Sequence, residues 1–304
     1  MTPTERNLNI DLFNNAVLFT ITLRAWGNRR KASTDVVDTT ADKSRLHLTK
    51  KLLQTKELAA IYRFQRDTKD WCLKRSMPAF IRNGVYVVKL DMVEEFEKRL
   101  RAALEEQRER YIPDLLGVYD ASIKDAQREL GDLFRMKDYP AAGELARTFG
   151  IEWGWVTFGV PDNLPADLRA EESAKLRQKF LDAQEEIVTA LREGFGELLE
   201  YAIDRLKVEP GQKPKLLIKD VVKNRFEEFV ETFNARNFLE DKDLEAVVEE
   251  ARKVLSGMDM DRIKRSRGLR NRTAEAFEGL KKTVDGLIAE RPSRKFSFDE
   301  DEAA

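Results

Sequence analysis

Residues 166–207 read ADLRAEESAKLRQKFLDAQEEIVTALREGFGELLEYAIDRLK, the longest uninterrupted helical pattern in the chain. Apolar residues recur in this segment at spacings near three and four, and Gln184 falls where another apolar residue is expected. The spacing is typical of a coiled-coil seam, in which one side of a helix packs along a partner helix. The apolar members of this seam are Leu176, Phe180, Ile187, Leu191, Phe195, Leu198, Ala202 and Leu206.

Charged residues make up 36% of the 304-residue chain, compared with about 25% in an ordinary domain. The 54 Lys and Arg nearly balance the 55 Asp and Glu, and Gly and Pro are few. The balance excludes a globally basic nucleic-acid-binding protein and a globally acidic one. Together with the apolar spacing, this composition predicts long helices with charged, solvent-facing sides.

A second long helical pattern covers 91–137, in which Pro113 is expected to break or kink the helix. At about 1.5 Å per residue, straight helices over 91–137 and 166–207 have similar lengths, roughly 70 and 63 Å. We therefore expect these helices to form an antiparallel hairpin, with the segment between them near its tip. Further helical patterns cover 43–76, 140–149, the stretch after the Pro-Gly linker at 209–214, 240–255 and 259–290.

Three short segments predict β-structure. Residues 17–23 alternate between apolar and polar, and 150–160 is rich in aromatic, β-branched and glycine residues. Asn83-Gly84 separates two apolar runs within 79–88, which predicts a hairpin with a type I′ turn. The expected fold class is mainly α, with long coiled-coil-like helices in an antiparallel hairpin or bundle and this small β element.

The same patterns divide the chain into four expected regions. Residues 1–90 form a small α+β region, and 91–208 form the long helical hairpin that contains the strand at 150–160. A C-terminal helical region covers 215–290. The acidic tail at 291–304 is expected to be disordered, because its composition offers little apolar surface to bury.

The chain holds no combination of residues that predicts catalysis or metal binding. Its one histidine, His47, and its one cysteine, Cys72, are too few for a Cys/His zinc site or a disulfide framework. No phosphate-binding glycine loop, dinucleotide fingerprint or serine nucleophile elbow is present. We therefore predict no enzyme activity, no cofactor, and no catalytic, cofactor-binding or metal-ligating residues.

Two basic clusters are candidate binding surfaces, and each has more than one interpretation. Either cluster could neutralise nucleic-acid phosphates or dock an acidic protein segment, including this chain's own tail. The later cluster could also be a solvated helix start, although cations there oppose the helix dipole. The members of the later cluster are Arg262, Lys264, Arg265, Arg267, Arg270 and Arg272; those of the earlier cluster, around Trp26, are Arg24, Arg29, Arg30 and Lys31.

Two aromatic segments are candidate docking elements. Trp153, Trp155 and Phe158 either pack as a strand into the body or form an exposed tongue that docks a partner or a membrane. Phe296 and Phe298 precede four consecutive acids in the tail. Such a tail either docks into a basic, apolar groove or only improves solubility.

The chain is predicted to be cytoplasmic. Its apolar runs are far shorter than the roughly 20 residues of a membrane-spanning helix. Its first residues lack the basic-then-apolar order of a signal peptide, and a single unpaired cysteine fits a reducing compartment.

Four segments follow one another in a recognisable order. They are LRAWGNRRK at 23–31, KKLL at 50–53 before KEL at 56–58, PAF at 78–80 through GVYVV at 84–88, and IEW at 151–153 leading to VPDNLP at 160–165. In this order they resemble an uncharacterised domain family of phages, integrative elements and bacteria, over residues 10–240. Members of that family are often encoded near a MoxR-type AAA ATPase and a von Willebrand A-type protein resembling cobaltochelatase subunits. The resemblance implies a mobile-element protein that works with a ring ATPase, and it implies no catalytic residues.

The leading hypothesis is a non-enzymatic helical adaptor, substrate or structural partner of an AAA ATPase-containing assembly of a phage or mobile element. One alternative is a nucleic-acid-binding accessory protein that uses the 262–272 cluster and the basic residues at 24–31. Another is a membrane-active protein that inserts the aromatic tongue. Coiled-coil seams also permit self-association.

Overall fold

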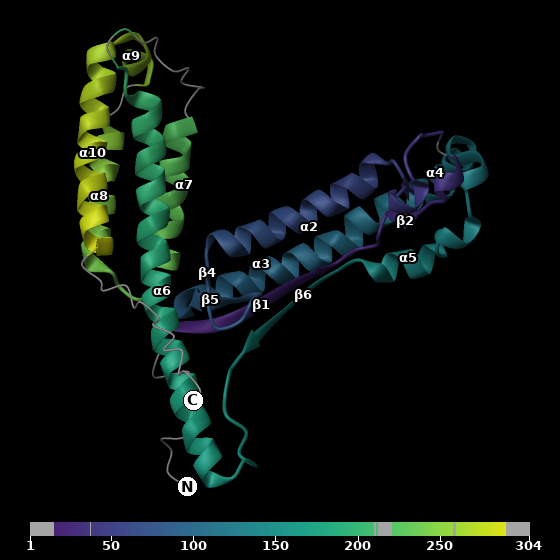
Figure 1. Cartoon of the computed structure of the whole chain (residues 1–304), viewed down its shortest axis with the longest axis horizontal. Helices are drawn as coiled ribbons and strands as arrows, with labels where there is room; N and C mark the ends of the chain where they lie inside the picture. The colour runs from purple at the N-terminus through teal and green to yellow at the C-terminus, as the bar shows by residue number, and fades with distance from the viewer. Residues whose placement is uncertain (1–14, 37, 210, 212–220, 258–259, 290–304) are drawn as a thin grey trace, which may run out of the picture. The chain divides into compact units, whose positions relative to one another are not determined.

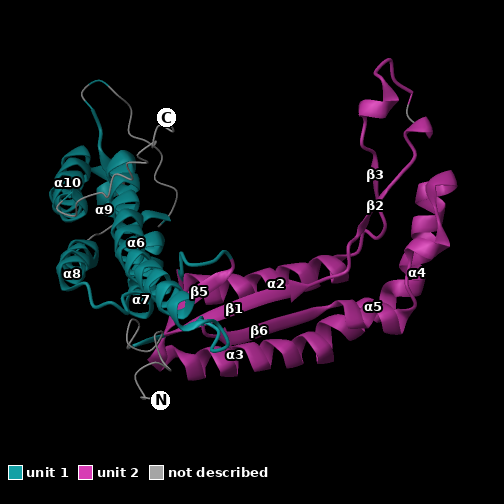
Figure 2. Cartoon of the chain, turned by 60° about the horizontal axis from the view of Figure 1, so that its bottom comes forward, with its two compact units in different colours: residues 1–16, 78–83, 158–304 teal, residues 17–77, 84–157 magenta. Residues whose placement is uncertain are grey.

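The computed structural model describes residues 15–36, 38–209, 211, 221–257 and 260–289 (Figure 1). The chain divides into two compact units, coloured separately in Figure 2. Unit 1 comprises 1–16, 78–83 and 158–304, and unit 2 comprises 17–77 and 84–157. The division therefore places most of the expected 1–90 region and the expected 91–137 helix in the same unit.

An antiparallel sheet of four strands lies at the centre of unit 2. Its order is β4 (Met77–Pro78), β5 (Val85–Lys89), β1 (Ala16–Arg24) and β6 (Gly150–Val156). β1 pairs with β6 from Leu18 opposite Val156 to Arg24 opposite Gly150. The strands predicted at 17–23 and 150–160 are therefore present, although the second ends at Val156.

The hairpin predicted over 79–88 differs in its turn. β4 has two residues only, and the loop 79–84 joins it to β5. Among the described non-glycine residues, only Phe80 and Glu240 have positive φ, whereas Gly84 has φ +79°. A type I′ turn needs positive φ at both central residues, so this part of the prediction is wrong. Phe80, at φ +55°, turns the chain before Asn83 is reached.

The helix predicted over 43–76 begins later, at Lys56. α2 (Lys56–Lys74) starts where the Thr55 hydroxyl accepts a hydrogen bond from the Leu58 amide at 3.2 Å. The preceding residues are extended instead, because β3 (Thr49–Lys51) pairs with β2 (Arg29–Lys31).

Pro113 does not break the next helix. α3 (Val93–Glu106) passes through a π-helical segment, η5 (Gln107–Tyr111), into α4 (Ile112–Leu130). Proline removes one backbone donor and crowds the carbonyl four residues before it. The wider π turn just before Pro113 accommodates that change, so the helix is disturbed near the predicted place but, of the expected break or kink, the break does not occur.

α4 ends at Leu130, because Gly131 has φ +48° and the chain then leaves the helix. The short helix predicted over 140–149 is α5 (Ala142–Thr148). Short 3₁₀ turns lie at Thr34–Val36, Lys43–Arg45, Leu90–Met92, Gly131–Leu133 and Met136–Asp138.

Aromatic side chains fill the space between the sheet and α3. The rings of Phe19 and Phe96 meet edge to face at a centroid distance of 5.3 Å. The Trp155 ring lies 5.0 Å from Phe19, and the Trp71 ring lies 5.0 Å from Phe96. Cys72 is fully buried in the same cluster. A second core cluster forms around Tyr119 and other residues of α2, α4 and α5.

Among the described residues of unit 1, four long helices form a bundle (Figure 1). α6 (Ala166–Leu206) packs on α10 (Arg267–Ala289) and α7 (Val221–Arg236), and both of these pack on α8 (Lys242–Ser256). α10 runs antiparallel to α6, since Arg270 contacts the carbonyl of Leu206 whereas Arg192 contacts the carbonyl of Leu287.

The seam of α6 therefore has a different partner from the one expected. The expected partner, 91–137, lies in unit 2, and α10 and α7 cover the seam instead. Among the predicted seam residues, Leu176 and Leu198 are half-buried and the others are buried. Leu199, Gly196 and Arg192 are buried as well, because α6 is covered on two sides.

Aromatic residues also fill the bundle. The Phe226 and Phe277 rings stack at 5.1 Å, and Phe195 lies 5.0 Å from Phe229. The helix predicted over 259–290 is divided at Ser266 into α9 (Met260–Arg265) and α10. The Ser266 hydroxyl accepts a hydrogen bond from the Leu269 amide and so begins a new helix there. None of the described helices combines the length and hydropathy needed to cross a bilayer.

Candidate nucleic-acid interface

Unit 2 has a two-stranded ribbon, formed by β2 and β3 (Figure 2). Basic residues gather on this ribbon. β2 and β3 are antiparallel, with Arg29 opposite Lys51, Arg30 opposite Lys50 and Lys31 opposite Thr49. Directly opposite residues share a face, and successive residues alternate between faces. One face therefore carries Arg29, Lys31, Thr49 and Lys51, which we call the basic ribbon face.

All four residues of the basic ribbon face are exposed. Within the described part of the chain, no salt bridge involves Arg29, Lys31 or Lys51. Like charges placed directly opposite each other destabilise a strand pair. The repulsion between Arg29 and Lys51 therefore destabilises the ribbon locally, and a bound anionic ligand would reduce it.

The other face of the ribbon is held to the body of unit 2. The Lys50 ammonium lies 2.6 Å from the Asp138 carboxylate, in a position where only 5% of the Lys50 side chain is exposed. Lys50 also donates a hydrogen bond to the carbonyl of Leu133. Arg30 folds back and donates to the carbonyl of Gly27 at 2.8 Å. The side chains of Lys50 and Arg30 therefore do not belong to the basic ribbon face.

Asn28 and two leucines anchor the base of the ribbon. The Asn28 side-chain nitrogen, Nδ2, donates to the backbone carbonyl of Leu53 at 2.7 Å. The side-chain oxygen, Oδ1, accepts from the backbone amide of Leu53 at 2.8 Å. Leu52 and Leu53 are almost fully buried in the second core cluster. Such anchoring holds the three cations in a fixed arrangement and reduces the entropy lost when they bind a ligand.

Trp26 does not contribute an aromatic surface to this cluster. It is buried in the core, and its carbonyl accepts a hydrogen bond from the Tyr62 hydroxyl at 2.6 Å. Arg24 pairs with Glu152 at 2.7 Å. The earlier basic cluster is thus reduced to Arg29 and Lys31 on the ribbon face, with Arg30 on the other face.

The connection between β2 and β3 carries further charges. Residues 32–48, which join the two strands, contain two Lys and Arg against three Asp, so the excess of positive charge is on the strands. Asp42 shapes the connection by accepting a hydrogen bond from the Ser44 amide at 2.9 Å, and hydrogen bonding from Ser44 lowers the Asp42 pKa. His47 is exposed on the same connection.

The later basic cluster serves the structure of unit 1. Arg270 is buried and donates to the carbonyls of Leu206 and Arg205, while Arg267 donates to those of Val208 and Glu209. Burial lowers the pKa of Arg270. Both arginines therefore satisfy backbone acceptors at and just beyond the C-terminal end of α6.

The same contacts explain why cations lie at the start of α10. Their charge is unfavourable for the dipole of α10 itself but faces the negative C-terminal end of the antiparallel α6. Arg262, Arg265 and Arg272 are exposed. Lys264 belongs to α9, and its side chain is outside the described part of the structure.

The aromatic segment of β6 packs against α3. Trp153 and Trp155 are half-buried, and their indole N–H groups donate to Glu97 Oε1 at 2.8 and 2.9 Å. These hydrogen bonds lower the pKa of Glu97. The arrangement favours the packed strand over the exposed tongue. Phe158 is half-buried outside the strand, and Phe296 and Phe298 lie outside the described residues.

Lys51 is the interface residue that sequence reasoning missed. The doublet Lys50-Lys51 is visible in the sequence, but nothing local indicates that Lys51 lies opposite Arg29. Register across a ribbon depends on long-range pairing.

Among the described residues, no group of three or more His, Cys, Asp or Glu side chains is placed to hold a metal ion. Burial raises the pKa of Cys72 to about 12, so its thiol stays protonated. No protein-family model matches the chain, and no curated protein or solved structure matches it.

Proposed function

We propose that this chain is a nucleic-acid-binding accessory protein whose contact surface is the basic ribbon face. The observation that carries the proposal is the set of three exposed cations, Arg29, Lys31 and Lys51, on one face of an anchored ribbon. A two-stranded ribbon is narrow enough to enter the major groove of duplex DNA.

The contacts expected of this surface are contacts to phosphates. Arg and Lys neutralise phosphate charge, and the Thr49 hydroxyl is a further hydrogen-bond donor to phosphate oxygens. Binding through such contacts is insensitive to sequence and weakens steeply with salt. We therefore expect a dissociation constant of about 10⁻⁴ to 10⁻⁶ M at physiological salt, typical of non-specific binding.

The test is fluorescence anisotropy with labelled duplex DNA, single-stranded DNA and an RNA hairpin, measured over a range of salt concentrations. The triple variant Arg29→Glu, Lys31→Glu and Lys51→Glu is expected to lose binding to all of them. The single variant Lys51→Gln is expected to reduce the slope of log K against log salt concentration by about 1.

The matched control reverses three exposed arginines of the later cluster, with Arg262→Glu, Arg265→Glu and Arg272→Glu. It changes the net charge by the same amount and should bind as the unmodified protein does. Unchanged binding by the ribbon variant would contradict the proposal, and loss of binding by the control alone would transfer the interface to the later cluster.

The ATPase partnership implied by the family resemblance is a second proposal. It rests on that resemblance, and Leu181, a large apolar side chain of α6 that is 40% exposed in the described structure, is a surface position at which it can be tested. Purification from the native host, with and without nuclease, followed by mass spectrometry, tests it. Recovery of a MoxR-type ATPase after nuclease treatment, and its loss with Leu181→Glu, would support the partnership. Recovery that nuclease abolishes would count against it.

A further inference from the structure

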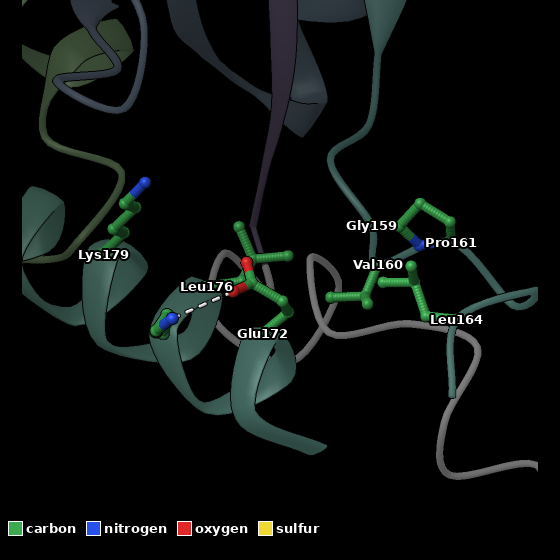
Figure 3. Close-up of a pocket in the computed structure, with 8 residues that line it drawn as sticks. Gly159, Val160, Pro161, Leu164, Glu172, Leu176 and Lys179 are labelled. Carbon is green, nitrogen blue, oxygen red and sulfur yellow. Dashed lines mark hydrogen bonds and ion pairs between the residues drawn. The ribbon is translucent and has the colours of Figure 1, made fainter. Parts of the chain in front are cut away.

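A groove lies between the loop at 159–164 and the N-terminal half of α6 (Figure 3). Its volume is about 180 Å³. Apolar groups line it from both sides, with Val160, Pro161 and Leu164 on the loop and Leu176 on α6. Glu172, Lys175 and Lys179 stand at its border on α6. The groove lies wholly within unit 1.

Arg169 fixes the loop against α6. One guanidinium nitrogen, Nη2, donates to the carbonyls of Asp162 at 2.6 Å and Leu164 at 3.2 Å. The Nε of the same guanidinium is buried and has no hydrogen-bond partner among the described residues. The groove is therefore supported by a hydrogen-bonded arginine that retains an unused donor.

The charge at the groove border is only partly neutralised. Lys175 pairs with Glu171 at 2.6 Å and Glu172 at 3.0 Å. Lys179 is exposed and forms no salt bridge with the described part of the chain. The border can therefore accept an acidic segment next to an apolar one.

The end of α10 points along α6 toward this groove. The last described turn of α10 lies beside Arg192, whose guanidinium donates to the Leu287 carbonyl. Leu176 precedes Arg192 by 16 residues in α6, which corresponds to a distance of about 24 Å along the helix axis. From Leu287 to Ala289 the chain is still helical and advances about 3 Å, and the seven residues from Ala289 to Phe296 span up to about 24 Å when extended, which gives about 27 Å in all. The chain beyond α10 is therefore long enough to bring Phe296 and Phe298 to the groove.

We propose that the groove binds the chain's own C-terminal segment, with a Phe296 or Phe298 ring in the apolar hollow and the acids at 299–302 beside Lys179 and Lys175. That segment lies outside the described residues. A cavity of about 150 Å³ accepts a benzene ring in other proteins, so the hollow suits a phenyl group. Covalent linkage supplies a local concentration in the millimolar range, so even a weak contact is populated. This inference does not depend on nucleic-acid binding.

Disulfide trapping in the full chain tests the proposal. The variant Val160→Cys with Ser297→Cys places one thiol in the lining of the groove and one between the two phenylalanines, and it keeps both lysines. Cys72 does not interfere, because it is fully buried. We expect the intramolecular disulfide to form about tenfold faster than in the control pair, because docking raises the local thiol concentration.

The control pair is Glu185→Cys with Ser297→Cys. Glu185 is exposed on α6 and lies nearer to the end of α10 than the α6 residues that line the groove do, but it points about 120° away from Lys179 around the helix. An undocked tail would reach Glu185→Cys at least as fast as Val160→Cys, so equal rates would overturn the proposal.

Two further variants complete the test. Phe296→Ser with Phe298→Ser, added to the Val160→Cys pair, should remove the rate advantage while the far-ultraviolet circular dichroism stays unchanged. If the faster disulfide formation were retained in this variant, the aromatic rings would not be what binds the groove, and that part of the proposal would be overturned. Disulfides between two chains, in place of disulfides within one chain, would overturn the proposal, because the groove would then bind the C-terminal segment of a second copy.

Discussion

At the scale of single residues, Glu97 links the sheet of unit 2 to α3. One of its oxygens accepts both indole N–H groups, from Trp153 and Trp155, and the other pairs with Arg101 at 2.7 Å. These contacts favour the ionised carboxylate, which is why its pKa is lowered from 4.5. The residue is therefore a pH-dependent contact in a cluster whose tryptophans report on it.

The first prediction concerns this contact. A lowered folded-state pKa contributes stability above pH 4.5, and that stability is lost as pH falls through the folded pKa. The midpoint of urea unfolding, followed by tryptophan fluorescence, should fall below pH 4.5. Glu97→Gln should lack part of this pH dependence, whereas Glu95→Gln, an exposed change on the same helix, should keep it. Identical pH profiles for all three proteins would contradict the prediction.

Arg192 has a corresponding role in unit 1. Its guanidinium binds the Asp241 carboxylate at two points, 2.7 and 3.0 Å, and both side chains are less than a tenth exposed. Asp241 also accepts from the Leu244 amide at the start of α8. The pair joins α6, α8 and, through Leu287, α10.

The second prediction is that Arg192→Met lowers the free energy of unfolding by about 3–5 kcal/mol, because it leaves a buried carboxylate without its cation. Lys207→Met is the control. Lys207 forms a salt bridge with Glu278 at a similar 2.7 Å, but the two side chains are 48% and 40% exposed, so a loss of only about 0–1 kcal/mol is expected. Chemical denaturation followed by circular dichroism measures both. Equal losses of unfolding free energy in the two variants would mean that burial does not determine how much an ion pair contributes to stability.

At the scale of elements, two glutamines connect α2, η5 and the ends of two strands. Gln65 Nε2 donates to the Gln107 side-chain oxygen at 2.8 Å, to the Arg24 carbonyl at 2.9 Å and to the Gly150 carbonyl at 3.3 Å. Gln107 lies in the π-helical turn, is fully buried, and its own Nε2 has no partner in the described structure.

The third prediction follows from this asymmetry. Gln65→Leu removes the donor from three buried acceptors and should cost about 1–3 kcal/mol. Gln107→Leu removes one acceptor and an unsatisfied donor, so its cost should be smaller than that of Gln65→Leu. Urea unfolding of the two variants, followed by tryptophan fluorescence, compares two changes of the same chemistry at adjoining positions. A larger loss for Gln107→Leu would contradict the assignment of these hydrogen bonds.

At the scale of the whole molecule, the two units can be observed separately. All four tryptophans, Trp26, Trp71, Trp153 and Trp155, lie in unit 2, whereas the helical bundle of unit 1 contains none. Tryptophan fluorescence therefore reports unit 2 alone, and far-ultraviolet circular dichroism reports the helices of both units.

The fourth prediction is that fluorescence and circular dichroism give unfolding transitions that do not coincide, because each unit has its own core and unfolding is then not two-state. Arg192→Met should move the circular dichroism transition and leave the fluorescence midpoint within error. Coincident transitions that shift together in this variant would mean that the two units unfold as one.

Local patterns predicted most of the elements. The 3.6-residue period of α6 and the alternation in β1 depend on neighbouring residues, so they are readable from the sequence. The π turn before Pro113 was missed, because a sequence pattern indicates where a regular helix is disturbed but not how the backbone relieves the disturbance. The division at Ser266 was missed because the serine interrupts no apolar period.

Within the candidate interface, the sequence indicated Arg29, Arg30 and Lys31 as a basic cluster. It did not distinguish Arg30, which folds back to Gly27, from its neighbours, and it did not place Lys51 among them. It also suggested Arg270 as a surface residue, although this side chain is buried against the end of α6. Exposure and pairing of a charged side chain depend on segments far away in the chain.

The sequence by itself determined that this protein is mainly helical, that 166–207 is one long helix with an apolar seam, and that strands precede 24 and follow 149. Only the tertiary structure decided that α10 and α7 cover that seam and that Lys51 lies opposite Arg29. The physical reason is that periodicity is set by backbone geometry within a few residues. By contrast, several amphipathic helices of similar length could cover one seam, and the choice depends on packing summed over the whole bundle.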